Sequence, residues 1–411
     1  MKRSVLFSIM AIAMAFSMVL SACTPAAPAA TTAPGAPAAA GSGGVIKIAT
    51  QSPLSGAMSA VGADIKNGAS LGIDQLSGPL TSMGFTVQIA SFDDQGDPNT
   101  GVANAKTIVA DPAILCIVGH YNSGVQIPSS EVYHSAGLAN VSPANTNPKV
   151  TDRGYLEVNR IVGRDDIQGS VGATFVNGMG VKTAYVLNDK TTYGQGIATF
   201  FQQEATKEGI KIVGSEGTDE TANFDPILTP IISANPDVVY LGGMYNQWAV
   251  LIKQARAKGY MGMFMSDDGF DSSEAAGIAG QSLMDGKGTY YSTVSGPASL
   301  YPGAAKFGTD FKAKFNHDPQ PFAAQAYDSA GICLTAIANA AKANGNKLPT
   351  RNAVALAIRA LVDYPGITGT INFNSKGDLK TASYYVYQVT SLDPTKWDST
   401  LAKTVQFAPP E

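Results

Sequence analysis

Residues 114–124 read ILCIVGHYNSG, and this stretch contains the unit that repeats along most of the chain. Ile114 to Val118 form a short, wholly apolar run, which is typical of a strand buried in a parallel sheet. A polar loop follows, and Ser123 to Ser135 is predicted to be a helix. A buried strand that leads directly into a helix begins a βαβ unit, so the stretch predicts an α/β fold.

The same alternation extends in both directions from this stretch. Further buried parallel strands are expected at Ile46 to Ala49, Val87 to Ser91, Thr183 to Leu187, Ile210 to Val213, Val238 to Leu241 and Met263 to Met265. The intervening helices are expected at Ala63 to Leu76, Thr100 to Ala110, Asp166 to Met179, Tyr193 to Lys207, Phe224 to Ala234 and Trp248 to Lys258. Repeated βα units imply open, doubly wound sheets with right-handed crossovers, and a folded part of about 365 residues favours two lobes.

The alternation changes near Tyr291. From Ala304 onward the pattern predicts three helical stretches, including Phe322 to Asn344 and Arg351 to Leu361, and then a strand at Tyr384 to Val389. The C-terminal third is therefore expected to complete one lobe and cross back to the other. The expected lobes are residues 45–164 with 292–377, and residues 165–291 with 378–411.

The N-terminus has the three parts of an export signal. Two basic residues precede the apolar run Val5 to Leu20, and small residues lead to Cys23. This ending resembles a bacterial lipobox, which predicts a signal peptide over residues 1–22 and a lipidated Cys23. The Ala- and Pro-rich residues 23–44 are expected to be a flexible tether. An ordinary cleaved signal with an incidental cysteine is the alternative; either way the folded part is expected outside the cytoplasm, and the lipid would anchor it to the membrane.

Bulk composition argues against several classes of function. The formal net charge is −4, and this mild acidity is not clustered, so neither nucleic acid nor an anionic membrane surface is expected as a partner. Three histidines without a second ligand at metal spacing argue against a zinc site, and no cofactor is expected. Cys116 and Cys333 are expected to be buried, unreactive thiols. A disulfide between them is the alternative in an exported protein.

Ligands of open α/β sheets bind beyond the carboxyl ends of the strands, and two such loops lie in the first half of the repeats. In residues 119–124, Ser123 and the backbone N–H groups beside it form a natural site for a carboxylate. The alternative is that Ser123 only caps the helix. In residues 142–146, Thr146 could supply a second hydroxyl to the same anion, although Ser-Pro-x-Asn is also common in turns.

Two further loops lie in the second half of the repeats. Residues 188–194 place Tyr193 at the start of a helix, and residues 266–269 carry Asp267 and Asp268. A carboxylate in the last loop can hold an ammonium group, or it can belong to a solvated acidic turn. Anion donors on one lobe and an acid on the other would suit a zwitterion held between them.

Eleven short segments give the chain a more specific resemblance. They are PLSG (53–56), NGA (67–69), DD (93–94) with DP (97–98), GH (119–120), RGY (153–155), NDK (188–190) with YG (193–194), YLGG (240–243), QARAKG (254–259) and KGDLK (376–380). In order and spacing, the sequence resembles the leucine/isoleucine/valine-type solute-binding proteins of bacterial ABC transporters. The resemblance runs from Ile46 to about Lys380. It implies two Rossmann-like lobes, joined by three crossing strands, that close over a ligand.

The resemblance also implies roles for residues. Ser123 and Thr146 match hydroxyls that bind the α-carboxylate, with backbone contacts from Ala144. Tyr193 matches a tyrosine that lines the cleft, and Asp268 matches the acid, usually Glu, that pairs with the α-ammonium. Around the ligand side chain the pocket is expected to be apolar. The full candidate set is Val61, Tyr121, Asn122, Ser123, Ala144, Asn145, Thr146, Tyr193, Met244, Asp268 and Phe322.

These expectations combine into one hypothesis. A monomeric, lipid-anchored extracytoplasmic protein captures a small amino acid, aliphatic or branched, and passes it to the permease of an ABC importer. The alternatives are an amide, urea or aromatic acid as ligand, a receptor that reports to a membrane sensor, and an exported hydrolase that uses Ser123 with His120 or His134. Because no third, orienting residue is evident for such a dyad, no enzymatic activity is expected.

Overall fold

The computed structural model describes residues 43–296, 300–301, 303–397 and 400–408. All of them belong to one compact unit that begins at Ala40. The predicted signal peptide, Cys23 and nearly all of the tether lie outside the described residues. The tether was predicted one residue too long, because Gly44 is already the first residue of a strand.

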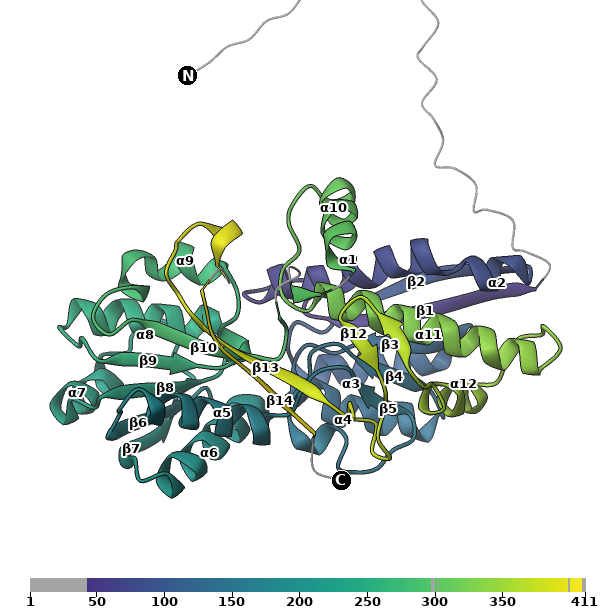
Figure 1. Cartoon of the computed structure of the whole chain (residues 1–411). Coiled ribbons are helices and arrows are strands. Elements are labelled where there is room, and N and C mark those ends of the chain that lie inside the picture. The colour runs from purple at the N-terminus through teal and green to yellow at the C-terminus, as the bar shows by residue number, and fades with distance from the viewer. Residues whose placement is uncertain (1–42, 297–299, 302, 398–399, 409–411) are drawn as a thin grey trace, which may run out of the picture. The chain divides into compact units, whose positions relative to one another are not determined.

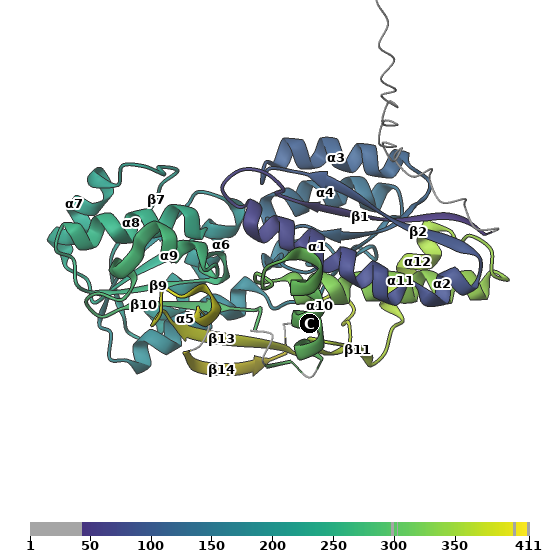
Figure 2. The same ribbon diagram turned by 90° about the horizontal axis from the view of Figure 1, so that it is seen from above.

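Within the described residues, the first sheet has five parallel strands in the order β2-β1-β3-β4-β5. They are β1 (Gly44–Ser52), β2 (Phe85–Asp93), β3 (Ile114–Gly119), β4 (Ala139–Ser142) and β5 (Val158–Arg160). The helices that follow β1 to β3 are α1 (Ser59–Leu76), α2 (Gly78–Ser82), α3 (Pro98–Ala110) and α4 (Ser123–Ser135). Figure 2 shows α3 and α4 on one face of this sheet and α1 on the other. Every residue of β3 is buried, because helices cover both faces.

The second sheet has seven strands among the described residues, in the order β14-β13-β10-β9-β8-β6-β7. The parallel strands are β6 (Thr183–Asn188), β7 (Lys211–Gly217), β8 (Val238–Gly242), β9 (Met263–Ser266) and β10 (Thr289–Thr293). The helices of this lobe are α5 (Asp165–Gly178), α6 (Thr192–Lys207), α7 (Asp225–Ala234), α8 (Tyr245–Ala257) and α9 (Glu274–Ala279) (Figure 1). The antiparallel β13 (Ala382–Gln388) and β14 (Leu401–Phe407) extend the sheet beyond β10.

The C-terminal third of the chain contributes to both lobes. Its helices are α10 (Ala304–Phe315), α11 (Ala323–Ala343) and α12 (Arg351–Arg359), and its short hairpin is β11 (Tyr364–Gly366) with β12 (Gly369–Ile371). Helix α11 packs on α1 so closely that a Cβ on Gly68 would lie 2.0 Å from the carbonyl oxygen of Ala323. The chain thus crosses between the sheets three times, after β5, after β10 and before β13. The predicted α/β architecture of two doubly wound lobes is confirmed.

Some expectations about the strands were wrong. Strands β2 and β7 were predicted to be buried, but both are half-exposed because each lies at the edge of its sheet and pairs on one side only. No strand was predicted at β5, which has three residues, or at β14, whose residues are mostly exposed. None of the helices in the described part of the chain is long and apolar enough to cross a bilayer.

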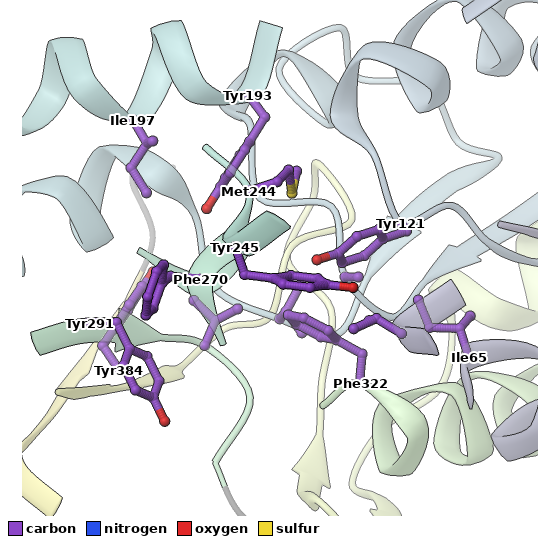
Figure 3. Packing of buried hydrophobic residues seen from close by; sticks show 14 of the residues in the cluster. Ile65, Tyr121, Tyr193, Ile197, Met244, Tyr245, Phe270, Tyr291, Phe322 and Tyr384 are labelled. Carbon is purple, nitrogen blue, oxygen red and sulfur yellow. The ribbon is translucent and has the colours of Figure 1, made fainter. Parts of the chain in front are cut away.

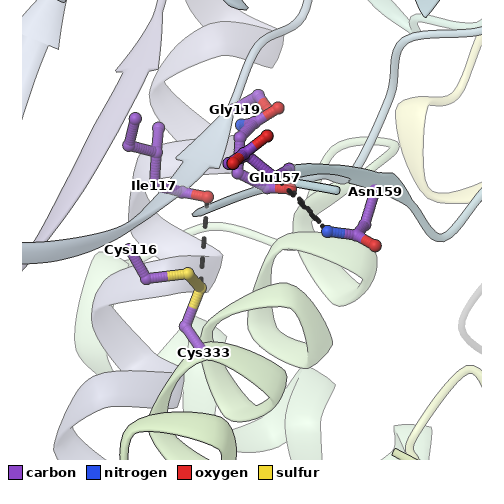
Figure 4. The surroundings of a disulfide bond; sticks show 7 residues. Cys116, Ile117, Gly119, Glu157, Asn159 and Cys333 are labelled. Atoms are coloured by element: carbon purple, nitrogen blue, oxygen red, sulfur yellow. Dashed lines mark hydrogen bonds between the residues drawn. A yellow bond between two sulfur atoms is a disulfide. The ribbon is translucent and has the colours of Figure 1, made fainter. Parts of the chain in front are cut away.

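The two cysteines form a disulfide, so the expectation of free buried thiols was wrong. Cys116 lies in the middle of β3 and Cys333 in α11, and both are fully buried (Figure 4). Their Cα atoms are 5.8 Å apart, although 217 positions separate them in the sequence. The bond therefore ties the returning C-terminal third to the central strand of the first sheet.

Removing this bond is expected to destabilise the protein. A double variant, Cys116→Ala with Cys333→Ala, should lose about 2–4 kcal/mol of unfolding free energy, because the bond closes a long loop and restricts the unfolded chain. Urea denaturation of both proteins, with and without reductant, measures this loss. Reductant should lower the midpoint of the wild type and leave the double variant unchanged. Equal midpoints for the oxidised wild type and the double variant would contradict the expected stabilisation.

A buried ion network joins two of the crossings between the lobes. Arg160 at the end of β5 contacts Asp378 at 2.5 Å, and Arg164, four residues later, contacts the other oxygen of the same carboxylate at 3.1 Å. All three side chains are at most 4% exposed. Burial alone would raise the pKa of Asp378, but the charge of Arg160 and its hydrogen bond outweigh burial and keep the pKa below its usual value. Asp378 is therefore ionised and balances two arginines.

Candidate functional site

The end of β3 places Ser123 in the first turn of α4. Ser123 is the first helical residue and is 2% exposed, and the N-cap is Asn122, whose side chain makes no capping hydrogen bond. The Ser123 hydroxyl oxygen accepts a hydrogen bond from the backbone N–H of Asn147 at 3.4 Å. The alternative that Ser123 only caps the helix is therefore wrong. The first turn of α4 leaves backbone N–H groups beside this hydroxyl, which is an arrangement suited to an anion.

The second loop lies against the first because Asn145 connects them. Its side-chain amide donates to the carbonyl oxygen of Tyr121 at 2.9 Å and accepts from the backbone N–H of His120 at 3.1 Å. Ala144 and Thr146, on either side of it, are 2% and 1% exposed. The two loops thus bring Ser123 and Thr146 to the same edge of the first sheet, while the side chain of Asn145 is engaged in holding the loops.

In the other lobe, Tyr193 and Asp268 are joined directly. Tyr193 lies at the start of α6, and its hydroxyl donates to a carboxylate oxygen of Asp268 at 2.8 Å. The same hydroxyl accepts from the backbone N–H of Gly269 at 3.0 Å. Asp268 begins the short 3₁₀ helix η2 (Asp268–Phe270) and is 4% exposed, so the alternative of a solvated acidic turn is wrong.

The burial of Asp268 determines its charge. Burial raises the pKa of its carboxyl to about 6, although the hydrogen bond from Tyr193 lowers the pKa in part. Near neutral pH the free protein therefore holds an ionised carboxylate with little water around it. A cation placed beside such a carboxylate stabilises its ionised form.

Sequence reasoning missed a second acid at this site. Asp165, the first residue of α5, is fully buried, and its backbone N–H donates to the carbonyl oxygen of Thr146 at 2.9 Å. Burial raises its pKa well above the usual value, and the negative charge of Asp268 raises it further. Neither carboxylate oxygen meets hydrogen-bond geometry with another described residue. The sequence signal was ambiguous, since an acid in the first turn of a helix is also ordinary helix chemistry.

Aromatic side chains from both lobes meet beside these polar groups. The ring of Tyr121 lies 5.9 Å from that of Phe322, and Figure 3 shows Met244 and Tyr245 of the other lobe approaching the same place. Each of these four side chains is at most 8% exposed, and Val61 on α1 is fully buried. Tyr245 was not among the site residues predicted from the sequence.

Hydrogen bonds also join the lobes at this place. The Tyr245 hydroxyl donates to the carbonyl oxygen of Ala57 at 2.8 Å, and the Asn147 side chain donates to that of Thr192 at 3.1 Å. The side chain of Asn122, another residue of the candidate set, contacts Met58: its amide donates to the Met58 sulfur at 3.5 Å.

The histidines are engaged elsewhere. The ring of His120 lies 3.1 Å from the hydroxyl of Tyr133 and 3.4 Å from a carboxylate oxygen of Asp94. His134 contacts Glu157 at 2.7 Å. Ser123 thus has neither histidine as a hydrogen-bond partner, which removes the geometric basis of the hydrolase alternative. In the residues that the structure describes, no group of three or more potential ligands could hold a metal ion.

A cavity of about 810 Å³ lies next to Phe322 and is lined by residues of both lobes, among them Phe307 of one lobe and Trp397 of the other. It contains none of the polar residues Ser123, Thr146, Tyr193 and Asp268. Gln325 in its wall already bonds Tyr301 at 3.0 Å and Ser295 at 3.3 Å. The side chains at the strand ends therefore do not line this cavity, whose own wall carries Asp271, Lys312 and Asp318.

Several known proteins resemble this chain in sequence and fold. A family model described as "Periplasmic binding protein" matches residues 45–394. An "Amino acid binding protein" of Pseudomonas aeruginosa is 33% identical over 84% of this chain and 90% of its own length. The "Leu/Ile/Val-binding protein homolog 1" of Brucella abortus is 32% identical over 82% and 88%. The crystal structure of the leucine binding protein LivK from Thermotoga maritima superposes with a TM-score of 0.78, at 26% identity, over 88% of this chain and 98% of LivK.

Proposed function

This chain belongs to the periplasmic binding protein family, and we propose that it captures a small amino acid, aliphatic or branched, and delivers it to an ABC importer. The names of its relatives support an amino acid as ligand. The observation that carries the proposal is the buried Asp268 carboxylate, held by Tyr193 in one lobe, with the hydroxyls of Ser123 and Thr146 in the other.

The two ends of an amino acid differ in charge and would bind to different lobes. The α-carboxylate would accept hydrogen bonds from Ser123, Thr146 and the free N–H groups of the first turn of α4, with a backbone contact at Ala144. The α-ammonium would lie between Asp268 and Asp165. A ligand without an amine would leave the Asp268 carboxylate buried and unpaired, which disfavours amides, ureas and aromatic acids.

Binding would work through closure of the lobes, which we assign to residues 45–164 with 292–377 and residues 165–291 with 378–411. Only the closed form pairs both charged ends of the ligand, so the ligand stabilises that form selectively. Closure also excludes water, and this strengthens the hydrogen bonds to the ligand. The contacts of Tyr245 with Ala57 and of Asn147 with Thr192 are candidates for bonds that form on closure.

The same proposal includes the location. A lipid on Cys23 would hold the protein at the membrane, and the tether would allow the monomeric binding unit to reach the permease. The N-terminal pattern of basic residues, apolar run and small residues before Cys23 supports this part of the proposal. Mass spectrometry of the protein extracted from bacterial membranes should find a diacylglyceryl-modified cysteine at the mature N-terminus. An unmodified N-terminus at another residue would contradict the anchor.

The ligand class can be tested by thermal shift. The twenty amino acids, short amides and aromatic acids are each added to the purified protein. A true ligand at a hundred times its dissociation constant should add about 2.7 kcal/mol of stability. An amide or aromatic acid that stabilises the protein when no amino acid does would contradict the proposal.

The pKa of Asp268 makes binding dependent on pH. Since the pKa is raised to about 6, Asp268 is mostly protonated at pH 5 and must lose this proton to pair with an ammonium group. Affinity should therefore fall about tenfold from pH 7 to pH 5, as calorimetry at several pH values can measure. The effect on the free protein has the opposite sign, since a raised carboxyl pKa gives stability that is lost as the pH rises through about 6.

The control for this dependence is Asp268→Asn, which cannot titrate. Its affinity should be low and should change little between pH 5 and pH 7. If the wild type binds equally well at both pH values, Asp268 is not the partner of the ammonium group.

A further inference from the structure

The hydroxyl of Tyr121 is a buried polar group without a use in the binding scheme above. Tyr121 follows β3 by two residues, and its side chain is 5% exposed. Its hydroxyl has no hydrogen-bond partner among the residues described by the structure. A buried phenol normally finds such a partner, and leaving it without one is unfavourable. The group is therefore suited to a partner that the protein itself does not supply.

The position of Tyr121 indicates where that partner would lie. Its ring packs at 5.9 Å from Phe322, in the part of the site expected to surround the ligand side chain. In Figure 3 its hydroxyl points toward Met244 and Tyr245 of the other lobe. Burial raises the pKa of Tyr121 well above its usual value, and Asp268 is the nearby charge that adds most to this rise. The phenol is thus neutral and lies near Asp268, the proposed partner of the ammonium group.

Two other tyrosines of the site, Tyr245 and Tyr193, do not share this property. The Tyr245 hydroxyl donates to the carbonyl oxygen of Ala57, and the Tyr193 hydroxyl donates to Asp268. The proposed ammonium group already has acceptors in Asp268 and Asp165. The Tyr121 hydroxyl, beside Phe322, therefore remains available to contact the variable part of the ligand.

We propose that Tyr121 recognises a hydroxyl group on the ligand side chain, so that threonine is preferred over valine. This inference rests on the proposed function, and it narrows the substrate class to small branched amino acids that carry a hydroxyl. Threonine and valine have nearly the same shape, so the pocket can distinguish them only by the hydroxyl that replaces a methyl group. A site built to hydrogen-bond a hydroxyl discriminates strongly against an analogue that lacks it, because its own polar group is then left unpaired.

Calorimetry with threonine and valine tests the inference. The wild type should bind threonine at least about tenfold more tightly than valine, as expected for one buried hydrogen bond. In Tyr121→Phe this ratio should fall to about one or reverse, mainly because threonine binds more weakly. The matched control is Tyr245→Phe, which also removes a phenol hydroxyl from the site. Since that hydroxyl bonds Ala57 across the lobes, its loss should weaken both ligands by the same factor and leave the ratio unchanged.

The outcomes separate this inference from the proposed function. If the wild type binds neither amino acid nor any other, the proposed function fails. A wild type that binds both and prefers valine overturns the role of Tyr121 without any variant. Equal weakening of both ligands by Tyr121→Phe would assign the phenol to the common ammonium end. Unchanged affinity for both ligands would show that the phenol does not contact the ligand, and either result overturns the inference.

Discussion

Replacing Asp268 with alanine is expected to weaken amino-acid binding by about 2–5 kcal/mol, which is the effect of removing one partner from a buried, hydrogen-bonded charge pair. Asp268 is 4% exposed, so the variant removes the charged partner of an ammonium group at a buried position. The variant also removes the acceptor of the Tyr193 hydroxyl, which lies 2.8 Å from the carboxylate. Isothermal titration calorimetry at pH 7 with the amino acid that stabilises the wild type measures the loss.

Two controls make this test specific. Asp219→Ala removes an acid of the same lobe whose side chain is 82% exposed, and it should leave the affinity unchanged. Asp268→Asn keeps the size and a hydrogen-bond acceptor but removes the charge, so it should lose most of the same binding energy. Unchanged affinity in Asp268→Ala, in a protein that is still folded, would rule out the assigned role.

Asp378→Ala should lower the free energy of unfolding by about 3–5 kcal/mol. The carboxylate lies between Arg160 and Arg164, and removing it leaves two buried guanidinium groups with less compensation. Arg164 still has Asp152 at 2.9 Å and Asp166 at 2.8 Å, whereas Arg160 loses the only carboxylate that contacts it among the described residues. The main loss is therefore expected from Arg160.

Urea denaturation followed by circular dichroism measures this effect. The matched control is Asp318→Ala, whose carboxylate contacts Lys312 in an exposed pair at 2.9 Å. An exposed pair of this kind contributes about 0–1 kcal/mol, so the control should change little. Similar unfolding free energies for the two variants would contradict the importance of the network at the crossings.

The local patterns of the sequence predicted the repeated units and failed at the sheet edges and crossings. Buried apolar runs such as Ile114 to Val118 carry a strong signal, because both faces of a central parallel strand must be apolar. Strand β5 (Val158–Arg160) has only three residues, of which two are polar. Its extended conformation therefore depends on its pairing with β4. Strand β14 is an exposed edge strand whose conformation depends on pairing with β13.

In the candidate site, too, local patterns predicted some residues, while others depend on contacts between distant parts of the chain. Ser123, Tyr193 and Asp268 could be proposed because each lies at a strand end or helix start with unusual polarity. Asp165 lies at a crossing between the lobes, and its role depends on how near the returning chain comes to Thr146 and Asp268. The disulfide depends in the same way on the packing of α11 against β3, which no local pattern encodes.

A crystal structure of the protein with the amino acid that stabilises it most would test the proposed binding mode directly. The carboxylate of that amino acid should accept hydrogen bonds from Ser123 and Thr146, and its ammonium group should lie within hydrogen-bond distance of Asp268. A ligand bound in the cavity beside Phe322 instead, or an Asp268 side chain turned to solvent in the closed form, would contradict the account.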